Sequence, residues 1–256
     1  MRILVTFAVE AEFAPWRKLR NLARTELGQV TVYQAQIGRA SVDFVVTGMG
    51  IENARRVTGV ALSESHQFCI ASGFAGALRP EHRVGNIVVA EAVQQLGKSK
   101  TLMSGRGLVR DAGLDGASRV KMLLTADHIV RTAEDKAQLA PFAAAVDMES
   151  FGVLSAAQER KRPAVAIRVI SDRHDRDIPV DIETTMDERG RVRIGGVLHY
   201  LGRHLAHLPA LIRLGRDSRT AAESLANFLE AYIKKISFFT HGWFPEGEGL
   251  EEVAAR

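Results

Sequence analysis

Val146-Asp147-Met148-Glu149-Ser150 and Arg168-Val169-Ile170-Ser171-Asp172 are the two stretches that decide how this chain is interpreted. The first places two carboxylates and a thioether where a helix is expected to begin, and the second ends an apolar run in a carboxylate. Short apolar runs bounded by polar residues are typical of buried strands. Because open α/β sheets bind ligands at the ends of their strands, the two stretches predict a carboxylate-rich site at one edge of a sheet.

Strand-like and helix-like segments alternate along most of the chain. Glycines follow two of the expected strands, in Thr47-Gly48-Met49-Gly50 and Gly73-Phe74-Ala75-Gly76. This alternation predicts an α/β fold around a parallel or mixed sheet. We expect strands at 2–9, 30–37, 42–47, 68–72, 84–93, 120–125 and 164–171, and helices at 10–22, 51–65, 131–138 and 147–160. A polar, glycine-containing stretch runs over 97–116.

The C-terminal third has a different pattern. A polar stretch at 173–193 predicts a loop, and apolar residues at helical spacing predict one helix over 194–212 and a second over 222–236. Pro209 should break or restart the first of these helices. We therefore expect a catalytic domain at 1–193, a helical extension packed on it at 194–236, and a partly disordered tail at 237–256.

Composition narrows the class of protein. The chain has 256 residues, of which 46% are hydrophobic and 25% charged, as in ordinary globular proteins. Its one cysteine, Cys69, excludes an internal disulfide framework and a cysteine-based zinc site. The net charge of +4 is mild and its arginines are spread out, which argues against nucleic-acid binding. With no recognisable leader or membrane span, we expect a cytoplasmic protein without a metal centre.

The motifs, taken in order, resemble those of the nucleoside phosphorylase/nucleosidase superfamily, and within it the 5′-methylthioadenosine/S-adenosylhomocysteine nucleosidases. The resemblance covers about residues 1–180. It implies a three-layer αβα sandwich around a mixed sheet, here with extra C-terminal helices, a small nucleoside as substrate, no cofactor and a homodimer. The residues that carry it are Glu12, the two glycine motifs, Asp127 and the two stretches quoted first.

The resemblance also implies a role for each site residue. Asp172 would be the general acid that protonates purine N7, with Ser171 holding its carboxylate. Glu12 would activate the attacking water, and Glu149 would bind the ribose hydroxyls. The remaining expected contacts are Met148 and Arg168 around the sugar, Met49 and Val9 at the ribose or its 5′ substituent, Ile129 and Val130 at the base, and Gly73 and Phe74 near the nucleophile.

These roles suit the cleavage of an N-glycosidic bond. Breaking that bond leaves negative charge on the purine, so an acid is needed on the purine side. Positive charge develops on the sugar, and a carboxylate there stabilises it and orients water. We therefore predict a purine nucleoside N-glycosidase that releases adenine from a 5′-modified adenosine.

Two alternatives stay open. Phosphorylases of the superfamily hold phosphate with arginines and hydroxyl residues, whereas this chain has Phe74 and Ala71 at such positions and Glu12 would repel a phosphate dianion. Phe74 also differs from the residue that is usual at this position in the nucleosidases. The C-terminal extension, however, resembles that of hopanoid-associated phosphorylases, which predicts as an alternative a phosphorylase for a lipid-linked adenosine such as adenosylhopane, with phosphate as co-substrate.

A basic amphipathic extension also fits an anionic membrane surface, although we prefer packing on the core or across a dimer interface. The second alternative is a nucleoside-binding module without turnover. The joint presence of Glu12, Glu149 and Asp172 argues against it, because binding alone needs no general acid.

Overall fold

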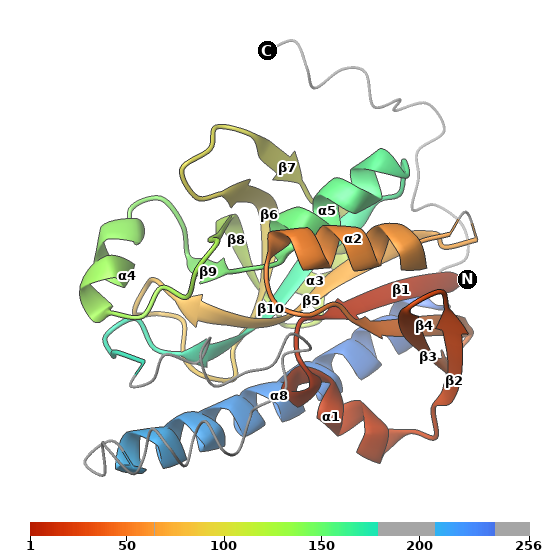
Figure 1. The fold of residues 1–256 in the computed structure, drawn as a ribbon, viewed down its shortest axis with the longest axis horizontal. Helices are drawn as coiled ribbons and strands as arrows, with labels where there is room; N and C mark the ends of the chain where they lie inside the picture. Colours follow the sequence, from red (N-terminus) through yellow and green to blue (C-terminus); the bar gives the residue numbers. More distant parts are fainter. Residues whose placement is uncertain (64, 179–207, 239–256) are drawn as a thin grey trace.

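A mixed β-sheet forms the centre of the molecule (Figure 1). The computed structural model describes residues 1–63, 65–178 and 208–238. Within them the strand order is β10-β6-β8-β9-β5-β1-β4-β3-β2, and β7 pairs with β6 outside this path. The strands are β1 (Arg2–Phe7), β2 (Ala23–Leu27), β3 (Val30–Ile37), β4 (Ala40–Val46), β5 (Phe68–Ala77), β6 (Ile87–Gln95), β7 (Thr101–Met103), β8 (Ser118–Thr125), β9 (Ala145–Asp147) and β10 (Ala164–Asp172).

Part of the sheet closes on itself. β10 pairs in parallel with β5 and antiparallel with β6, so that β5, β10, β6, β8 and β9 form a ring. Both parallel and antiparallel pairs occur elsewhere in the sheet, for example β1 with β4 and β3 with β4. The predicted mixed sheet is therefore confirmed.

Helices cover both faces of the sheet, as Figure 1 shows. Alternate residues of β10 point to opposite faces: Val165 and Ile167 belong to a buried cluster with residues of α1, α3 and α8, whereas Ala166 and Ile170 belong to one with residues of α2 and α5. This arrangement confirms the predicted three-layer αβα sandwich. The helices are α1 (Glu10–Leu19), α2 (Ile51–Ala61), α3 (Arg106–Leu114), α4 (Ala133–Leu139), α5 (Ser150–Glu159) and α8 (Leu208–Ile236).

The long helix α8 joins what the sequence divided between two helices. Leu211 and Ile212, expected in the first helix of the extension, belong to the same helix as the stripe that runs to Ile236. Pro209 lies in its first turn, where a missing N–H costs little. The predicted segment 194–207 and the tail from 239 onward lie outside the described residues. The stripe itself is buried at Ala222, Leu225, Leu229, Tyr232, Ile233 and Ile236.

Three local features differ from the prediction or were not predicted. Residues 73–76 are not a loop after a strand but part of β5, because β10 and β9 pair with this stretch. The polar, glycine-containing stretch 97–116, for which no element was predicted, contains β7 and the helix α3, which buries Leu108, Val109 and Ala112. The exposed edge strand β2 was not predicted, since none of its residues is buried.

The helix expected from Asp147 begins three residues later. Asp147 ends β9, Glu149 is the N-cap, and α5 starts at Ser150. Most other element boundaries differ from the prediction by a few residues at most.

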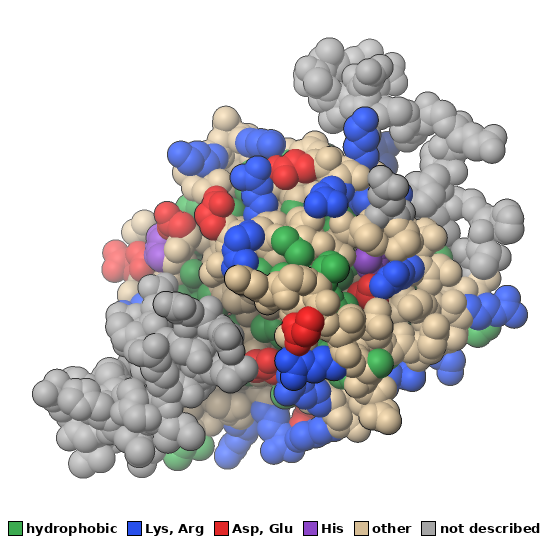
Figure 2. Space-filling model, turned by 45° about the vertical axis from the view of Figure 1, so that its right-hand side comes forward, with side chains coloured by type: hydrophobic (Ala, Val, Ile, Leu, Met, Phe, Trp, Pro, Cys, Tyr) green, Lys and Arg blue, Asp and Glu red, His purple; other side chains and the backbone are tan. Residues whose placement is uncertain are grey.

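Charged side chains of both signs are mixed on the face shown in Figure 2, where hydrophobic side chains gather near the centre. Lysines and arginines on this face do not form one continuous stripe. Within the described ranges, no helix combines the length and the apolar character needed to cross a bilayer.

Candidate functional site

A cavity of about 860 Å³ lies where the strands carrying the two motifs end. β5, β9 and β10 contribute to its wall, and α1 and α8 line it as well. All but two of the predicted site residues line this cavity: Val9, Glu12, Met49, Phe74, Ile129, Val130, Met148, Glu149, Ser171 and Asp172. The exceptions, Gly73 and Arg168, contact lining residues from behind.

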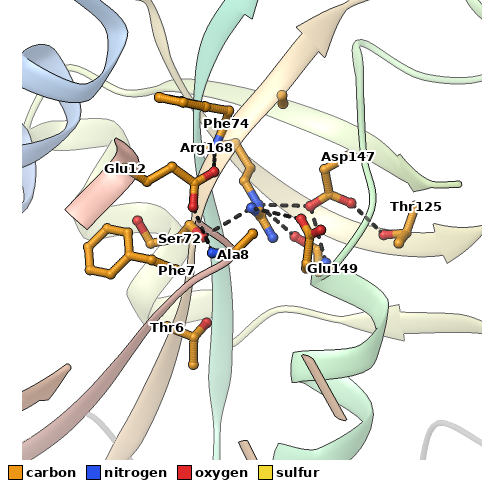
Figure 3. Close-up of polar contacts among 12 residues, drawn as sticks. Thr6, Phe7, Ala8, Glu12, Ser72, Phe74, Thr125, Asp147, Glu149 and Arg168 are labelled. Atoms are coloured by element: carbon orange, nitrogen blue, oxygen red, sulfur yellow. Dashed lines mark hydrogen bonds and ion pairs between the residues drawn. The ribbon is translucent and has the colours of Figure 1, made fainter. Parts of the chain in front are cut away.

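Arg168 is a buried cation behind the cavity. The residue is 1% exposed, and its Nε lies 2.8 Å from Asp147 Oδ2 and donates to Ser150 Oγ at 3.0 Å. Its Nη1 lies 3.7 Å from Glu149 Oε2 and donates to the Ser72 carbonyl at 3.0 Å (Figure 3). A buried charge is tolerated when it is paired and hydrogen-bonded, so these contacts explain an arginine in the otherwise apolar β10.

Asp147 fixes the junction between β9 and α5. Its Oδ1 accepts a hydrogen bond from Thr125 Oγ1 at 2.7 Å, and its Oδ2 accepts one from the Ser150 N–H at 3.1 Å. No role was predicted for Asp147 from the sequence. The signal for the ion pair was the presence of two acids, Asp147 and Glu149, in one motif and of Arg168 in the other.

Glu12 lies in the first turn of α1, and backbone N–H groups hold its carboxylate. Oε2 accepts from Ala8 at 2.6 Å and Val9 at 3.1 Å, and Oε1 accepts from Phe74 at 2.7 Å (Figure 3). Burial raises the pKa of Glu12 above its ordinary value, against the opposing effects of the Arg168 charge and these N–H donors. A raised pKa makes a carboxylate a better proton acceptor.

Glu149 is the second buried acid of the cavity. Its Oε1 accepts a hydrogen bond from the Gly50 N–H at 2.9 Å. Burial raises the pKa of Glu149 to about 8; the Arg168 charge opposes this shift, and the neighbouring charges of Asp147 and Glu12 add to it. Near neutral pH, this carboxyl can therefore both donate and accept hydrogen bonds.

Asp172 reaches the cavity through an irregularity in β10. Ile170 pairs with Ala75 and Asp172 with Gly76, so Ser171 is an extra residue on its strand. Such bulges redirect the neighbouring side chains and are frequent beside active sites. Ser171 Oγ donates to Asp172 Oδ1 at 3.1 Å.

Lys136 is a residue of the site that was not predicted from the sequence. Its Nζ donates to Asp172 Oδ2 at 2.6 Å from α4. The local sequence Ala-Glu-Asp-Lys-Ala-Gln-Leu at 133–139 is typical of a solvent-exposed helix, so no local signal pointed to this contact.

The loop after β8 forms another part of the wall. Ile129 and Val130, both predicted at the base, line the cavity together with His128. Asp127, which helped to identify the motif order, does not line it: its side chain is 81% exposed and its Oδ1 lies 2.7 Å from His128 Nδ1.

The apolar wall of the cavity was also missed. It consists of Ala14, Pro15 and Leu19 on α1, and Leu211, Leu214, Ala222 and Ala226 on α8. The helical spacing in α8 was visible in the sequence, but spacing does not tell which partner a helix faces.

Three acids of the site, Asp147, Glu149 and Asp172, pair with cations of the protein itself, Arg168 and Lys136. Across the described part of the chain, no group of three or more His, Cys, Asp or Glu residues is arranged to hold a metal ion.

A family model, the Phosphorylase superfamily, matches residues 2–198. This chain belongs to the phosphorylase superfamily. A curated relative, a 5′-methylthioadenosine/S-adenosylhomocysteine nucleosidase of Colwellia psychrerythraea (strain 34H / ATCC BAA-681), is 25% identical over 233 residues, which cover 79% of this chain and 96% of that protein. The resemblance stated from the motifs is thereby confirmed.

Solved structures share the phosphorylase-superfamily fold of this chain at low identity. A 5′-methylthioadenosine/S-adenosylhomocysteine nucleosidase of Helicobacter pylori has a TM-score of 0.70 at 17% identity. The match covers 92% of this chain and 98% of the H. pylori chain. The corresponding nucleosidase of Neisseria meningitidis, in complex with methylthio-immucillin-A, has a TM-score of 0.69 at 19% identity, with coverages of 91% and 99%. Futalosine hydrolase of H. pylori has a TM-score of 0.70 at 17% identity, with coverages of 92% and 98%.

Proposed function

We propose that this chain is a purine nucleoside N-glycosidase that uses water to release adenine from a 5′-modified adenosine of the methylthioadenosine or S-adenosylhomocysteine type. One observation carries the proposal: Asp172 on β10 and the buried acids Glu12 and Glu149 line the same cavity from different elements. Cleavage of a glycosidic bond needs an acid at the leaving group and carboxylates at the sugar.

In this reaction the bond between C1′ and the purine N9 breaks as the Asp172 O–H transfers its proton to purine N7. Glu149 binds the ribose hydroxyls, and its negative form stabilises the positive charge that develops on the sugar. Glu12 takes a proton from the water whose oxygen forms the new bond to C1′. The three N–H groups on the Glu12 carboxylate fix its direction in advance.

The remaining lining residues suit a nucleoside. Met148 packs on the sugar, while Met49 and Val9 border the ribose or its 5′ substituent. Ile129 and Val130 form the apolar sides of the base pocket. Arg168 keeps the acids in place through its ion pairs.

Water is the better nucleophile here than phosphate. Glu12 and Glu149 are both acids, and the cation next to them, Arg168, already pairs with Asp147 and Glu149. Among the described residues, a phosphate dianion beside Glu12 and Glu149 would therefore meet negative charge, and the nearby Arg168 is already ion-paired. Phe74 supplies an apolar side chain to the lining, and Ala71 is fully buried in the strand.

The prediction that the chain is an enzyme is confirmed by its family and by relatives that are nucleosidases. The homodimer and the cytoplasmic location are part of the proposal. Light scattering of the purified protein tests the first, and fractionation of the source cells tests the second.

A second candidate is favoured by the apolar wall between α1 and α8. Leu19, Leu211 and Leu214 line the same cavity as the three acids. A lipid-linked adenosine, cleaved with phosphate as co-substrate, would place its chain along this wall, since burial of apolar surface stabilises binding.

The test is release of free adenine from 5′-methylthioadenosine, S-adenosylhomocysteine and adenosine, each with and without phosphate. Futalosine belongs in the panel because a structurally similar protein is a futalosine hydrolase. Release that does not depend on phosphate supports the nucleosidase. Release that requires phosphate, or only from an adenosine with a long apolar 5′ chain, supports the second candidate.

A further inference from the structure

Lys136 is an unusual residue for the place it occupies. It lies on the short helix α4, and its side chain is 0% exposed. Lysines are almost never fully buried unless they are paired, because removing an ammonium from water costs several kcal/mol, on the order of the penalty for any buried ion. A burial of this kind needs a compensating set of contacts.

Those contacts use the full hydrogen-bonding capacity of the ammonium. Nζ donates to Asp172 Oδ2 at 2.6 Å, to the Arg173 carbonyl at 2.8 Å and to the Arg176 carbonyl at 3.0 Å. An ammonium has three N–H donors, so no donor remains for a ligand. Lys136 also does not line the cavity. Any effect of Lys136 on a bound nucleoside must therefore act through Asp172.

Asp172 is consequently held at both oxygens. Ser171 Oγ donates to Oδ1 at 3.1 Å, and Lys136 donates to Oδ2. The first contact comes from the adjacent residue, whereas the second anchors the carboxylate to α4. Further contacts tie the start of α4 to the segment after β10, since the Ala133 N–H donates to Asp177 Oδ1 at 2.8 Å and the Ile178 N–H donates to the Arg131 carbonyl at 2.9 Å.

We propose that Lys136 is the positioning residue of the general acid, orienting the Asp172 carboxyl toward the purine and stabilising the carboxylate that remains after proton transfer. This inference rests on the proposed function. In the step concerned, the Asp172 O–H bond breaks, the purine N7–H bond forms, and the new negative charge lies beside the Lys136 ammonium. A proton from solvent restores the carboxyl after the base departs. Lys136 itself gains and loses no proton.

The experiment is a double-mutant cycle on turnover of 5′-methylthioadenosine, or of whichever nucleoside the wild type cleaves. It compares wild type, Lys136→Met, Asp172→Asn and the double variant. Lys121→Met is the matched control, because Lys121 is an exposed lysine on β8. Lys136→Met should lower kcat on the order of 10- to 100-fold, as misplacement of a reacting group does, with KM within about 3-fold.

The decisive comparison is made in the Asp172→Asn background. There Lys136→Met should change kcat by less than about 3-fold, because residues that act through one another are not additive. A purely structural lysine would slow both backgrounds equally, and that result would overturn the inference. A kcat of Lys136→Met equal to that of the Lys121→Met control would overturn it as well.

Two further outcomes of this experiment also have a defined interpretation. If Lys136→Met does not fold, Lys136→Gln takes its place, since its amide keeps donors for the two carbonyls without the charge. If Asp172→Asn itself retains wild-type turnover, the proposed acid is wrong and the proposed function fails, independently of Lys136. If Asp172→Asn loses turnover but Lys136→Met does not, only the positioning role of Lys136 is contradicted.

Discussion

Replacement of Gly73 by alanine is a sharp test of the site geometry. Gly73 lies inside β5 with φ of +138°, a backbone conformation that residues with a side chain rarely adopt. Holding an alanine there costs on the order of 1–3 kcal/mol of folding free energy. Gly73 is also next to the two groups on which the proposed water activation depends, Glu12 and Arg168.

The added methyl group has no room. Its carbon would lie 2.6 Å from Arg168 Nη1 and 2.7 Å from Glu12 Oε1, whereas ordinary contacts begin at 3.4 Å. Both groups would have to retreat by about 0.7–0.8 Å. Because a displacement of about 1 Å at a reacting group can cost about 100-fold in rate, we expect Gly73→Ala to lose turnover of that order.

The assay combines steady-state kinetics of adenine release with urea denaturation. Gly59→Ala is the control: Gly59 lies in α2 with nothing within 4 Å of the added carbon. There an alanine should leave turnover unchanged and raise the free energy of unfolding by up to about 1 kcal/mol. Wild-type turnover in a folded Gly73→Ala protein would refute the assigned geometry of Glu12 and Arg168.

Four other substitutions test separate parts of the site. Asp172→Asn should lower kcat by about 10²- to 10⁴-fold with KM within a few-fold, measured by initial rates. Glu12→Gln should abolish hydrolysis, and a gain of phosphate-dependent cleavage in the same assay would argue against water as the nucleophile. Because the pKa of Glu149 rises from 4.5 to about 8 on folding, the folded protein holds this proton more tightly, and that contribution to stability, complete below pH 4.5, is lost as the pH rises to 8. Glu149→Gln should therefore flatten the fall in unfolding free energy between pH 5 and 8, measured by urea titrations. Leu214→Glu should raise KM roughly 10-fold for nucleosides with long apolar 5′ groups and leave adenosine unaffected, because a charge on the apolar wall disfavours only the former.

The predictable part of the site is the part encoded within short stretches. The buried strand that ends in Asp172 and the acids of the other motif could be recognised because strand and helix boundaries leave local patterns. The motif order then indicated the superfamily, and with it the layers of the fold.

What could not be predicted depends on contacts between distant segments. Whether residues 73–76 form a loop or a strand is decided by pairing with β10 and β9, which overrides the local preference of glycine. The burial of Lys136 depends on the segment after β10 folding back onto α4. In the same way, the sequence of α8 contains its apolar stripe but not the identity of its partner helix.

The pairing of β10 with β5 determines when activity appears during folding. Gly76 and Asp172 become partners only when two strands far apart in the sequence have paired, and such long-range pairing forms slowly compared with local helices. No fragment ending before β10 contains a complete constellation of acids. During refolding from urea, the helical circular dichroism signal should therefore recover first, and catalytic turnover should mark the moment at which the ring of strands has closed.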